Sequence, residues 1–129
     1  MFLLNFMITY QNAPVQVREK FSFSKKHRNE LMRQICCETG VKGCVILNTC
    51  NRTEIYAVAE RGESIEGIIL LLKDINPDVE NYLEVSSGNE AIRHLFRVAS
   101  GLESLIIGEN QILAQVKNNY FECKSECST

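Results

Sequence analysis

The sequence has no excess of basic charge, no long apolar run, no internal repeat and no low-complexity segment. Fourteen Lys and Arg residues stand against sixteen Asp and Glu, for a formal net charge of -2. The chain therefore lacks the overall positive charge that would indicate nucleic-acid binding. Any bound RNA would need a local basic patch or a surface outside this chain. The apolar start, residues 1–10, is too short to span a membrane and lacks the basic n-region of a secretory leader.

Six cysteines stand at positions 36, 37, 44, 50, 123 and 127. An even number could form disulfides, but Cys36 and Cys37 are adjacent within a helical pattern and no leader precedes them. We therefore expect reduced thiols in a cytoplasmic protein. Cys123 and Cys127 could suggest a metal site, to which His27, Cys36 and Cys37 would be recruited. No second pair has ligand spacing, so we expect no metal.

The apolar pattern predicts one α+β domain. The 129 residues, 45% hydrophobic and 23% charged, suffice for one core. We expect strands over residues 3–10, 45–47, 55–59 and 82–85, and helices over 25–38, 64–73, 88–100 and from 110. The first six elements have the order β-α-β-β-α-β of a ferredoxin-like sheet with helices on one face. Residues 1–86 would form this α/β subdomain, and 87–129 a helical part.

Helix signals and buried stripes accompany these elements. Ser24 is a candidate N-cap for the first helix and Gly40 its stop. Ser87-x-x-Glu90 has the spacing of a capping box. The residues expected on the buried faces of the three helices are Leu31, Met32, Ile35 and Cys36, then Ile65, Ile68, Ile69 and Leu72, then Ile92, Leu95, Phe96 and Ala99.

His94 falls outside the expected buried stripe of its helix. At about 100° per residue it lies roughly 150° from the centre of that stripe. It would therefore face either solvent or a second layer of structure. Spacing alone favours an exposed histidine without a function.

The segment 44–60 places a cysteine at the tip of a turn between two strands. The thiolate is the nucleophilic form of cysteine, and a cation or backbone N–H groups must stabilise it near neutral pH. Arg52, two residues from Cys50, always carries a charge. Thr49, Asn51 and Thr53 are short polar side chains able to hold a substrate. The alternative is a hairpin turn with a buried, inert Cys50.

Two stretches resemble the glutamyl-tRNA reductases. Residues 48–56, Asn-Thr-Cys-Asn-Arg-Thr-Glu-Ile-Tyr, are similar to the nucleophile motif of that family, and the block 93–117 matches it as well. Two long motifs in the right order are far more specific than a short pattern such as C-x-x-C. The similarity runs from the first strand to about Lys117.

The resemblance implies an acyl transfer followed by a reduction. Cys50 would attack the ester carbonyl of glutamate on its tRNA and form a thioester. Hydride from NADPH would reduce that thioester to glutamate-1-semialdehyde, the precursor of 5-aminolevulinate and tetrapyrroles. Arg52 would bind the substrate carboxylate through a bidentate pair. His94 would assist as a base or by polarising the carbonyl.

The resemblance also implies a set of substrate-binding residues. Besides Arg52, these are Thr49, Asn51, Ser104, Glu109, Asn110, Gln111 and Gln115. Ser104 and Glu109 could instead cap the last helix, and the two glutamines could be solvated. The chain departs from the family pattern at Tyr10, where a histidine is usual, at Asn110, where proline or threonine is common, and at Ala114, where glycine is usual.

Reductases of this family are longer than this chain. They continue into an NADPH-binding domain and a helical dimerisation domain. No G-x-G-x-x-G follows a strand here, so no NADPH site is expected in these residues. We therefore expect residues 1–129 to be the N-terminal catalytic domain, either excised or truncated. The family's implied partners are glutamyl-tRNA, glutamate-1-semialdehyde aminotransferase as a channelling partner, and a second subunit bound through the C-terminal domain.

Two other readings fit the same residues. One is an interaction module that binds tRNA, haem or a protein without turnover. The other is a thioester-forming hydrolase that needs no NADPH. Cys50, Arg52 and His94 together favour an enzyme, because a pure binder has no need of an activated thiol.

Overall fold

The computed structural model describes residues 1–48, 51–99 and 120–123. In chain order its elements are β1 (Phe2–Thr9), α1 (Val15–Lys20), α2 (Lys25–Thr39), β2 (Gly43–Asn48), β3 (Arg52–Ala59), α3 (Glu63–Ile75), the 3-10 turn η1 (Val79–Asn81), β4 (Glu84–Ser87), α4 (Asn89–Ala99) and β5 (Phe121–Glu122). The strands form one sheet in the order β4-β1-β3-β2-β5. Every described pair is antiparallel. The predicted α+β class is confirmed.

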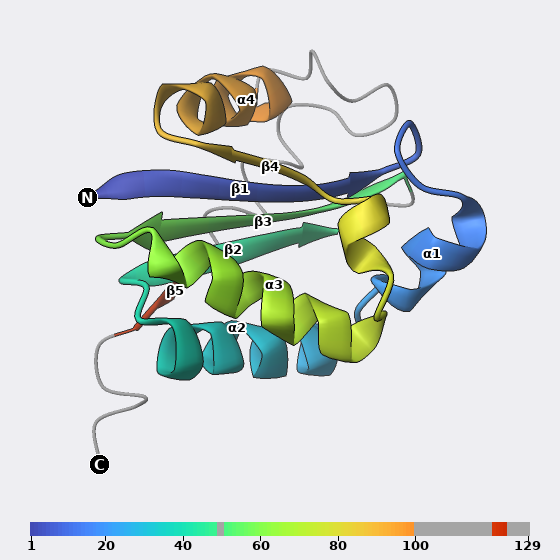
Figure 1. Cartoon of the computed structure of the whole chain (residues 1–129), viewed down its shortest axis with the longest axis horizontal. Coiled ribbons are helices and arrows are strands. Elements are labelled where there is room, and N and C mark those ends of the chain that lie inside the picture. The colour runs from blue at the N-terminus through green and yellow to red at the C-terminus, as the bar shows by residue number, and fades with distance from the viewer. Residues whose placement is uncertain (49–50, 100–119, 124–129) are drawn as a thin grey trace.

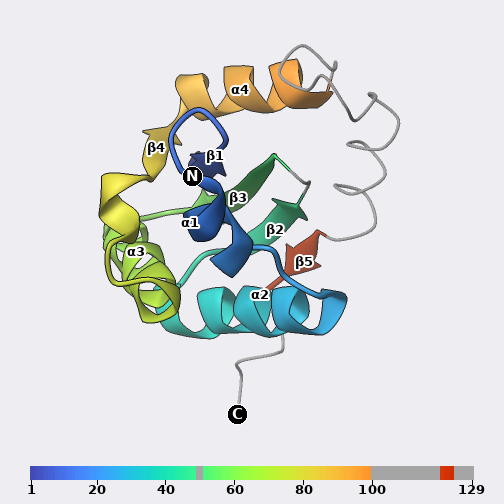
Figure 2. The same cartoon turned by 90° about the vertical axis from the view of Figure 1, so that its right-hand side faces the viewer.

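The sheet lies between two layers of helix. Figures 1 and 2 show α2 and α3 side by side on one face and α4 on the other. Successive side chains of a strand point to opposite faces. Leu4, Phe6 and Ile8 of β1 therefore face α2 and α3 and belong to the larger core. Leu3, Asn5 and Met7 face the side of α4.

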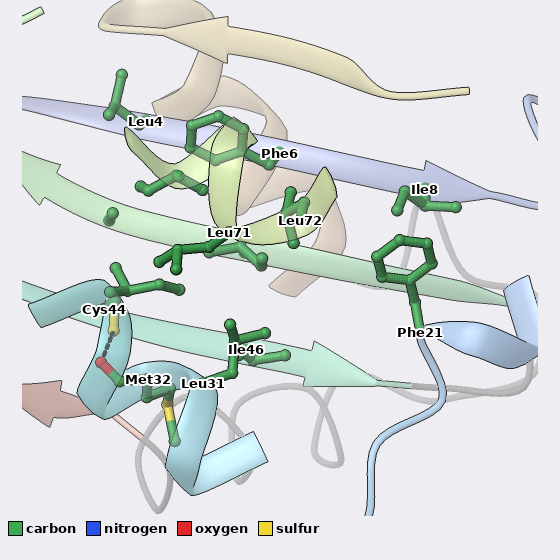
Figure 3. Packing of buried hydrophobic residues seen from close by; sticks show 14 of the residues in the cluster. Leu4, Phe6, Ile8, Phe21, Leu31, Met32, Cys44, Ile46, Leu71 and Leu72 are labelled. Carbon is green, nitrogen blue, oxygen red and sulfur yellow. Dashed lines mark hydrogen bonds between the residues drawn. The ribbon is translucent and has the colours of Figure 1, made fainter. Parts of the chain in front are cut away.

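The larger core forms where the expected helix stripes meet the sheet. Figure 3 shows Leu31 and Met32 of α2 and Leu71 and Leu72 of α3 among the side chains of β1 and β2. The stripe predicted for α2 is confirmed, since its buried residues are Leu31, Met32, Ile35 and Cys36. In α3 the buried residues are Ser64, Ile68, Leu71 and Leu72, and the expected Ile65 and Ile69 are partly buried.

The predicted ends of α2 are also confirmed. The Ser24 hydroxyl accepts a hydrogen bond from the backbone N–H of His27 at 3.1 Å, which satisfies one of the free donors of the first turn. Gly40 follows the helix with φ of 74°, in the left-handed region that glycine adopts without strain.

The predicted buried stripe of α4 is wrong in part. Ala91 and Val98 are fully buried and Leu95 packs beneath them, whereas Ile92 is 41% exposed and Phe96 70% exposed. The helix rests on the sheet through residues spaced i, i+4 and i+7, a stripe less apolar than the one chosen from the sequence. His94 shares this inner side, with only 13% of its side chain exposed.

Several boundaries differ from the prediction. Between the first expected strand and the first expected helix lies α1, a helix of six residues that was not predicted. The fourth strand begins two residues later than expected, and Ser87 is its last residue, paired with Leu4. Ser87 therefore does not cap α4. Gly88, with φ of 64°, stands directly before that helix. The helix expected from residue 110 lies outside the described residues.

The expectation of reduced cysteines is contradicted. Cys36 of α2 and Cys123, which follows β5, form a disulfide with 5.3 Å between their Cα atoms. Cys37 is disulfide-bonded as well. The pairing joins residues 87 positions apart, and only the added edge strand β5 brings them together. Within the described ranges, no helix is both long and apolar enough to cross a membrane.

Candidate active site

The candidate site lies on the α4 side of β3, at the end where the β2–β3 turn begins. Arg52, Glu54 and Tyr56 alternate along β3 with residues of the larger core, so all three side chains point toward α4. Arg52 is 8%, Glu54 0% and Tyr56 2% exposed. Charged residues are rarely buried this deeply unless they are paired.

Glu54 is the centre of this cluster. Its Oε1 lies 2.7 Å from Nε2 of His94 and accepts a hydrogen bond from the Tyr56 hydroxyl at 3.1 Å. Its Oε2 accepts a longer bond, 3.5 Å, from Nη1 of Arg52. The carboxylate thus has a partner on each oxygen and an opposite charge beside it, which offsets the cost of burial.

The network fixes the orientation of His94. Nε2 of His94 lies against Oε1 of Glu54, and a carboxylate without a proton only accepts hydrogen bonds, so this contact suits the tautomer with its proton on Nε2. The imidazole also stacks on the Tyr56 ring, with centroids 6.5 Å apart and planes 24° apart. His94 is therefore held on two sides. The exposed position that helical spacing favoured for His94 is wrong, since only 13% of its side chain is exposed.

Asn48 and Thr53 tie the base of the β2–β3 turn to the α1–α2 connection. The Asn48 amide donates to the carbonyl oxygen of Phe21 and to the hydroxyl of Thr53, at 3.1 and 2.6 Å, and accepts from the backbone N–H of Phe23 at 3.0 Å. Thr53 donates to the same Phe21 carbonyl at 2.9 Å. The two residues face each other in the last pair of the hairpin. The turn between them therefore starts from a fixed base.

The predicted residue Asn51 meets Tyr10, a departure from the family pattern, just before the start of β3. The Asn51 carbonyl oxygen accepts from the backbone N–H of Tyr10 at 2.9 Å. This bond needs no particular side chain at position 10, where the family usually has histidine. The Tyr10 side chain itself is 46% exposed. The end of β1 is thus joined to the start of β3 by a backbone hydrogen bond.

The structure brings together only part of the predicted site. Arg52 and His94 meet through Glu54, and Asn51 lies directly before Arg52. The predicted residues outside the described part of the chain are Thr49, Cys50, Ser104, Glu109, Asn110, Gln111 and Gln115. Glu54 and Tyr56 were not predicted as site residues. The sequence pattern that could have identified them is a charged residue and a tyrosine at alternate positions of a strand, on the face that also carries Arg52.

Cys44 differs chemically from a nucleophile. It is fully buried, its thiol donates a weak hydrogen bond to the Met32 carbonyl oxygen at 3.7 Å, and burial raises its pKa to about 12. Figure 3 shows this thiol inside the larger core. The described residues contain no group of three or more His, Cys, Asp or Glu that could hold a metal ion.

Known proteins resemble this chain over nearly its whole length. The family model described as glutamyl-tRNAGlu reductase, N-terminal domain, matches residues 7–129. The chain belongs to the glutamyl-tRNA reductase family. The glutamyl-tRNA reductase of Heliobacterium mobile is 42% identical over 99% of the chain, and that of Geobacillus thermodenitrificans is 42% identical over 88%.

A solved reductase structure supports the same assignment. Glutamyl-tRNA reductase from Methanopyrus kandleri matches 90% of this chain with a TM-score of 0.64 and 40% identity. The chain spans 30% of the Heliobacterium protein, and 26% of both the Geobacillus protein and the Methanopyrus chain. As a member of the glutamyl-tRNA reductase family it thus corresponds to a small part of these relatives.

Proposed function

We propose that this chain performs the acyl-transfer half of the glutamyl-tRNA reductase reaction. The observation that carries the proposal is the buried cluster of Arg52, Glu54, Tyr56 and His94 beside the turn that contains Cys50. Cys50 precedes Arg52 by two residues, so their Cα atoms cannot lie more than about 7 Å apart. A thiol, a cation and a positioned imidazole are the groups that thioester formation requires.

In the proposed step one bond to the acyl carbon forms and one breaks. Cys50 loses its thiol proton, and Sγ bonds to the acyl carbon of the glutamyl ester. The bond from that carbon to the ribose oxygen breaks, and the oxygen takes up a proton as the hydroxyl of free tRNA. His94, with Nε2 held by Glu54, is oriented to move a proton at Nδ1.

Arg52 would bind the side-chain carboxylate of the glutamyl group. Its planar guanidinium matches the two oxygens of a carboxylate, and its Nη1 lies 3.5 Å from Oε2 of Glu54. Glu54 would thus orient both the base and the substrate-binding cation. Thr49, Asn51, Ser104, Glu109, Asn110, Gln111 and Gln115 complete the proposed glutamate pocket by family resemblance.

The reduction is assigned to the longer reductase. NADPH would supply the hydride, and the site present here does not fit that cofactor, because the described sheet is antiparallel throughout and has no parallel β-α-β unit. Binding of NADPH, dimerisation and channelling to glutamate-1-semialdehyde aminotransferase would therefore depend on residues beyond this chain. The short share of each relative that the chain spans supports this division.

Two finer assignments belong to the same proposal. The ferredoxin-like class is supported by the β4-β1-β3-β2 order and by α2 and α3 packing on one face. The second is a cytoplasmic location, in which the Cys36–Cys123 disulfide of the structure would be exposed to reduction. The oxidation state of that pair in cells is a direct check of the location.

The test is transfer of labelled glutamate from glutamyl-tRNA to the protein in the absence of NADPH. Label should reach the wild-type chain and be absent in Cys50→Ser, while Cys44→Ala, at the buried cysteine, keeps it. His94→Gln should slow labelling about 100-fold or more, whereas His27→Gln, at the chain's other histidine, should not. Arg52→Lys should raise the concentration of glutamyl-tRNA needed for half-maximal labelling.

The outcomes separate the rival readings. Cys50-dependent release of free glutamate, without stable label, would indicate the hydrolase. A folded chain that binds glutamyl-tRNA but neither takes up label nor releases glutamate would favour the interaction module and contradict the proposal.

A further inference from the structure

A cavity with His94 in its lining lies between α4 and the β1–β4 edge of the sheet. Its volume is about 290 Å³, and it is lined by Met7, Ser86, Glu90, Arg93, His94 and Arg97. This is at the lower end of the volumes typical of ligand sites, roughly 300 Å³ and above. It suits one small group rather than a whole cofactor.

The charge of this cavity is positive. Arg93 and Arg97 are four residues apart and therefore on one face of α4, with His94 beside them. Glu90 is the one carboxylate among the described lining residues. The guanidinium groups outnumber it, and their planar N–H donors match the oxygens of phosphate.

Buried polar atoms without partners lie in the lining residue Ser86 and in its neighbour Asn5. The Ser86 hydroxyl is buried and forms no hydrogen bond in the described part of the chain. Asn5, which faces Ser86 across the β1–β4 pairing, is 0% exposed, and both polar atoms of its amide also have no partner there. Buried polar groups are rarely left unsatisfied in folded proteins, so bound water or a polar group beside Ser86 would complete this part of the structure.

We propose that this cavity is a phosphate subsite next to the acyl-transfer centre. The assignment rests on the proposed function. In glutamyl-tRNA the glutamate is esterified to the terminal ribose, and that ribose carries the last phosphodiester of the acceptor strand. A substrate whose carbonyl reaches His94 therefore brings this phosphate to within one nucleotide of the same side chain. Arg93 and Arg97 would bind it and so fix the leaving group.

The experiment follows His94 by NMR while phosphates are added to the whole 129-residue chain. The sequence has two histidines, so the imidazole signals of His94 and His27 can be assigned with His94→Gln. The probes are inorganic phosphate, a ribotrinucleotide with the sequence CCA, and NADPH. Saturable shifts of the His94 signal report binding in the cavity and need no turnover.

Three variants should change phosphate affinity in different ways. Arg93→Gln should weaken binding of phosphate and of the trinucleotide about tenfold, the loss of one charge-assisted contact. Glu90→Gln removes the opposing carboxylate and should tighten binding about threefold. Arg61→Gln is the matched control, because Arg61 is an exposed arginine on the connection between β3 and α3, and it should change affinity less than twofold.

The results test whether the cavity binds phosphate and which molecule carries that phosphate. Tighter binding of the trinucleotide than of NADPH assigns the phosphate to tRNA, and the reverse order overturns that source in favour of the dinucleotide. Shifts at His94 that are insensitive to Arg93→Gln and Glu90→Gln overturn the subsite itself. A chain that takes up glutamate label but shows this insensitivity refutes only the subsite. A chain that shows the expected phosphate pattern but takes up no label refutes only the proposed function.

Discussion

The contact between Glu54 and His94 should be one of the strongest polar couplings in the domain. The two side chains approach to 2.7 Å, Glu54 has no exposed surface, and His94 is largely shielded. A hydrogen bond to a charged group is worth about 1.5–3 kcal/mol, and burial keeps it from being screened. A double-mutant cycle with Glu54→Gln and His94→Gln should therefore give a coupling free energy of about 2 kcal/mol.

The single substitutions should differ in size. Glu54→Gln also leaves the Arg52 guanidinium, 8% exposed, without its carboxylate, so it should lower the free energy of unfolding by about 3 kcal/mol. His94→Gln leaves the Arg52–Glu54 pair intact and should cost less. The measurement is urea unfolding followed by far-ultraviolet circular dichroism, with m-values compared so that only stability is scored.

A surface pair supplies the matched control. Lys42 and Glu60 are 3.7 Å apart, and both side chains are more than half exposed. Their cycle, with Lys42→Gln and Glu60→Gln, should give at most about 0.5 kcal/mol. If the Glu54–His94 coupling is no larger than this, Glu54 does not hold His94, and the orientation that we assign to the imidazole is refuted.

Three other predictions follow from single contacts. Asn48→Ala removes the hydrogen bonds to Phe21, Phe23 and Thr53 and should lower the free energy of unfolding by about 2 kcal/mol; an unchanged urea midpoint would contradict it. The raised pKa of Cys44, about 12 against 9.0, means that the folded state keeps the thiol proton longer than the unfolded state. The contribution of the protonated Cys44 thiol to the free energy of unfolding should therefore be fully present below pH 9 and be lost as pH rises toward 12, by up to about 4 kcal/mol. The free energy of unfolding of the Cys44→Ala variant should fall less over that range. The Cys36–Cys123 disulfide should appear as a cross-linked peptide in mass spectra of the oxidised chain. Replacing both cysteines by serine should cost up to about 4 kcal/mol, and equal stability would refute its role.

The hairpin and α2 were predictable because their signals are local. Ser24 and Gly40 mark the ends of α2, and its apolar residues recur at helical spacing. The run from Val45 to Leu47 and the β-rich segment after residue 54 predicted the two strands, although β3 begins earlier, at Arg52. That early start matters, because it brings Arg52 and Glu54 into the sheet.

The orientation of α4 was not predictable from its own residues. The most apolar stripe of the helix contains Ile92 and Phe96, and both are exposed. The sheet face beneath α4 carries the buried carboxylate of Glu54, which needs a polar partner. Ala91 and Val98 allow close packing there, and His94 supplies the partner. The side of α4 that faces inward is therefore the one that gives Glu54 of β3 a polar partner, and not the most hydrophobic side of the helix.

By itself, the sequence determined the α+β class, the limits of α2, the two paired strands β2 and β3 and the family to which the chain belongs. Each of these depends on residues close together in the chain or on motifs of fixed spacing. Only the tertiary structure decided that His94 is bound to Glu54, 40 residues away, and that Cys36 meets Cys123. Such contacts depend on which strands pair and which helix covers which face, and neither is encoded in the spacing of neighbouring residues.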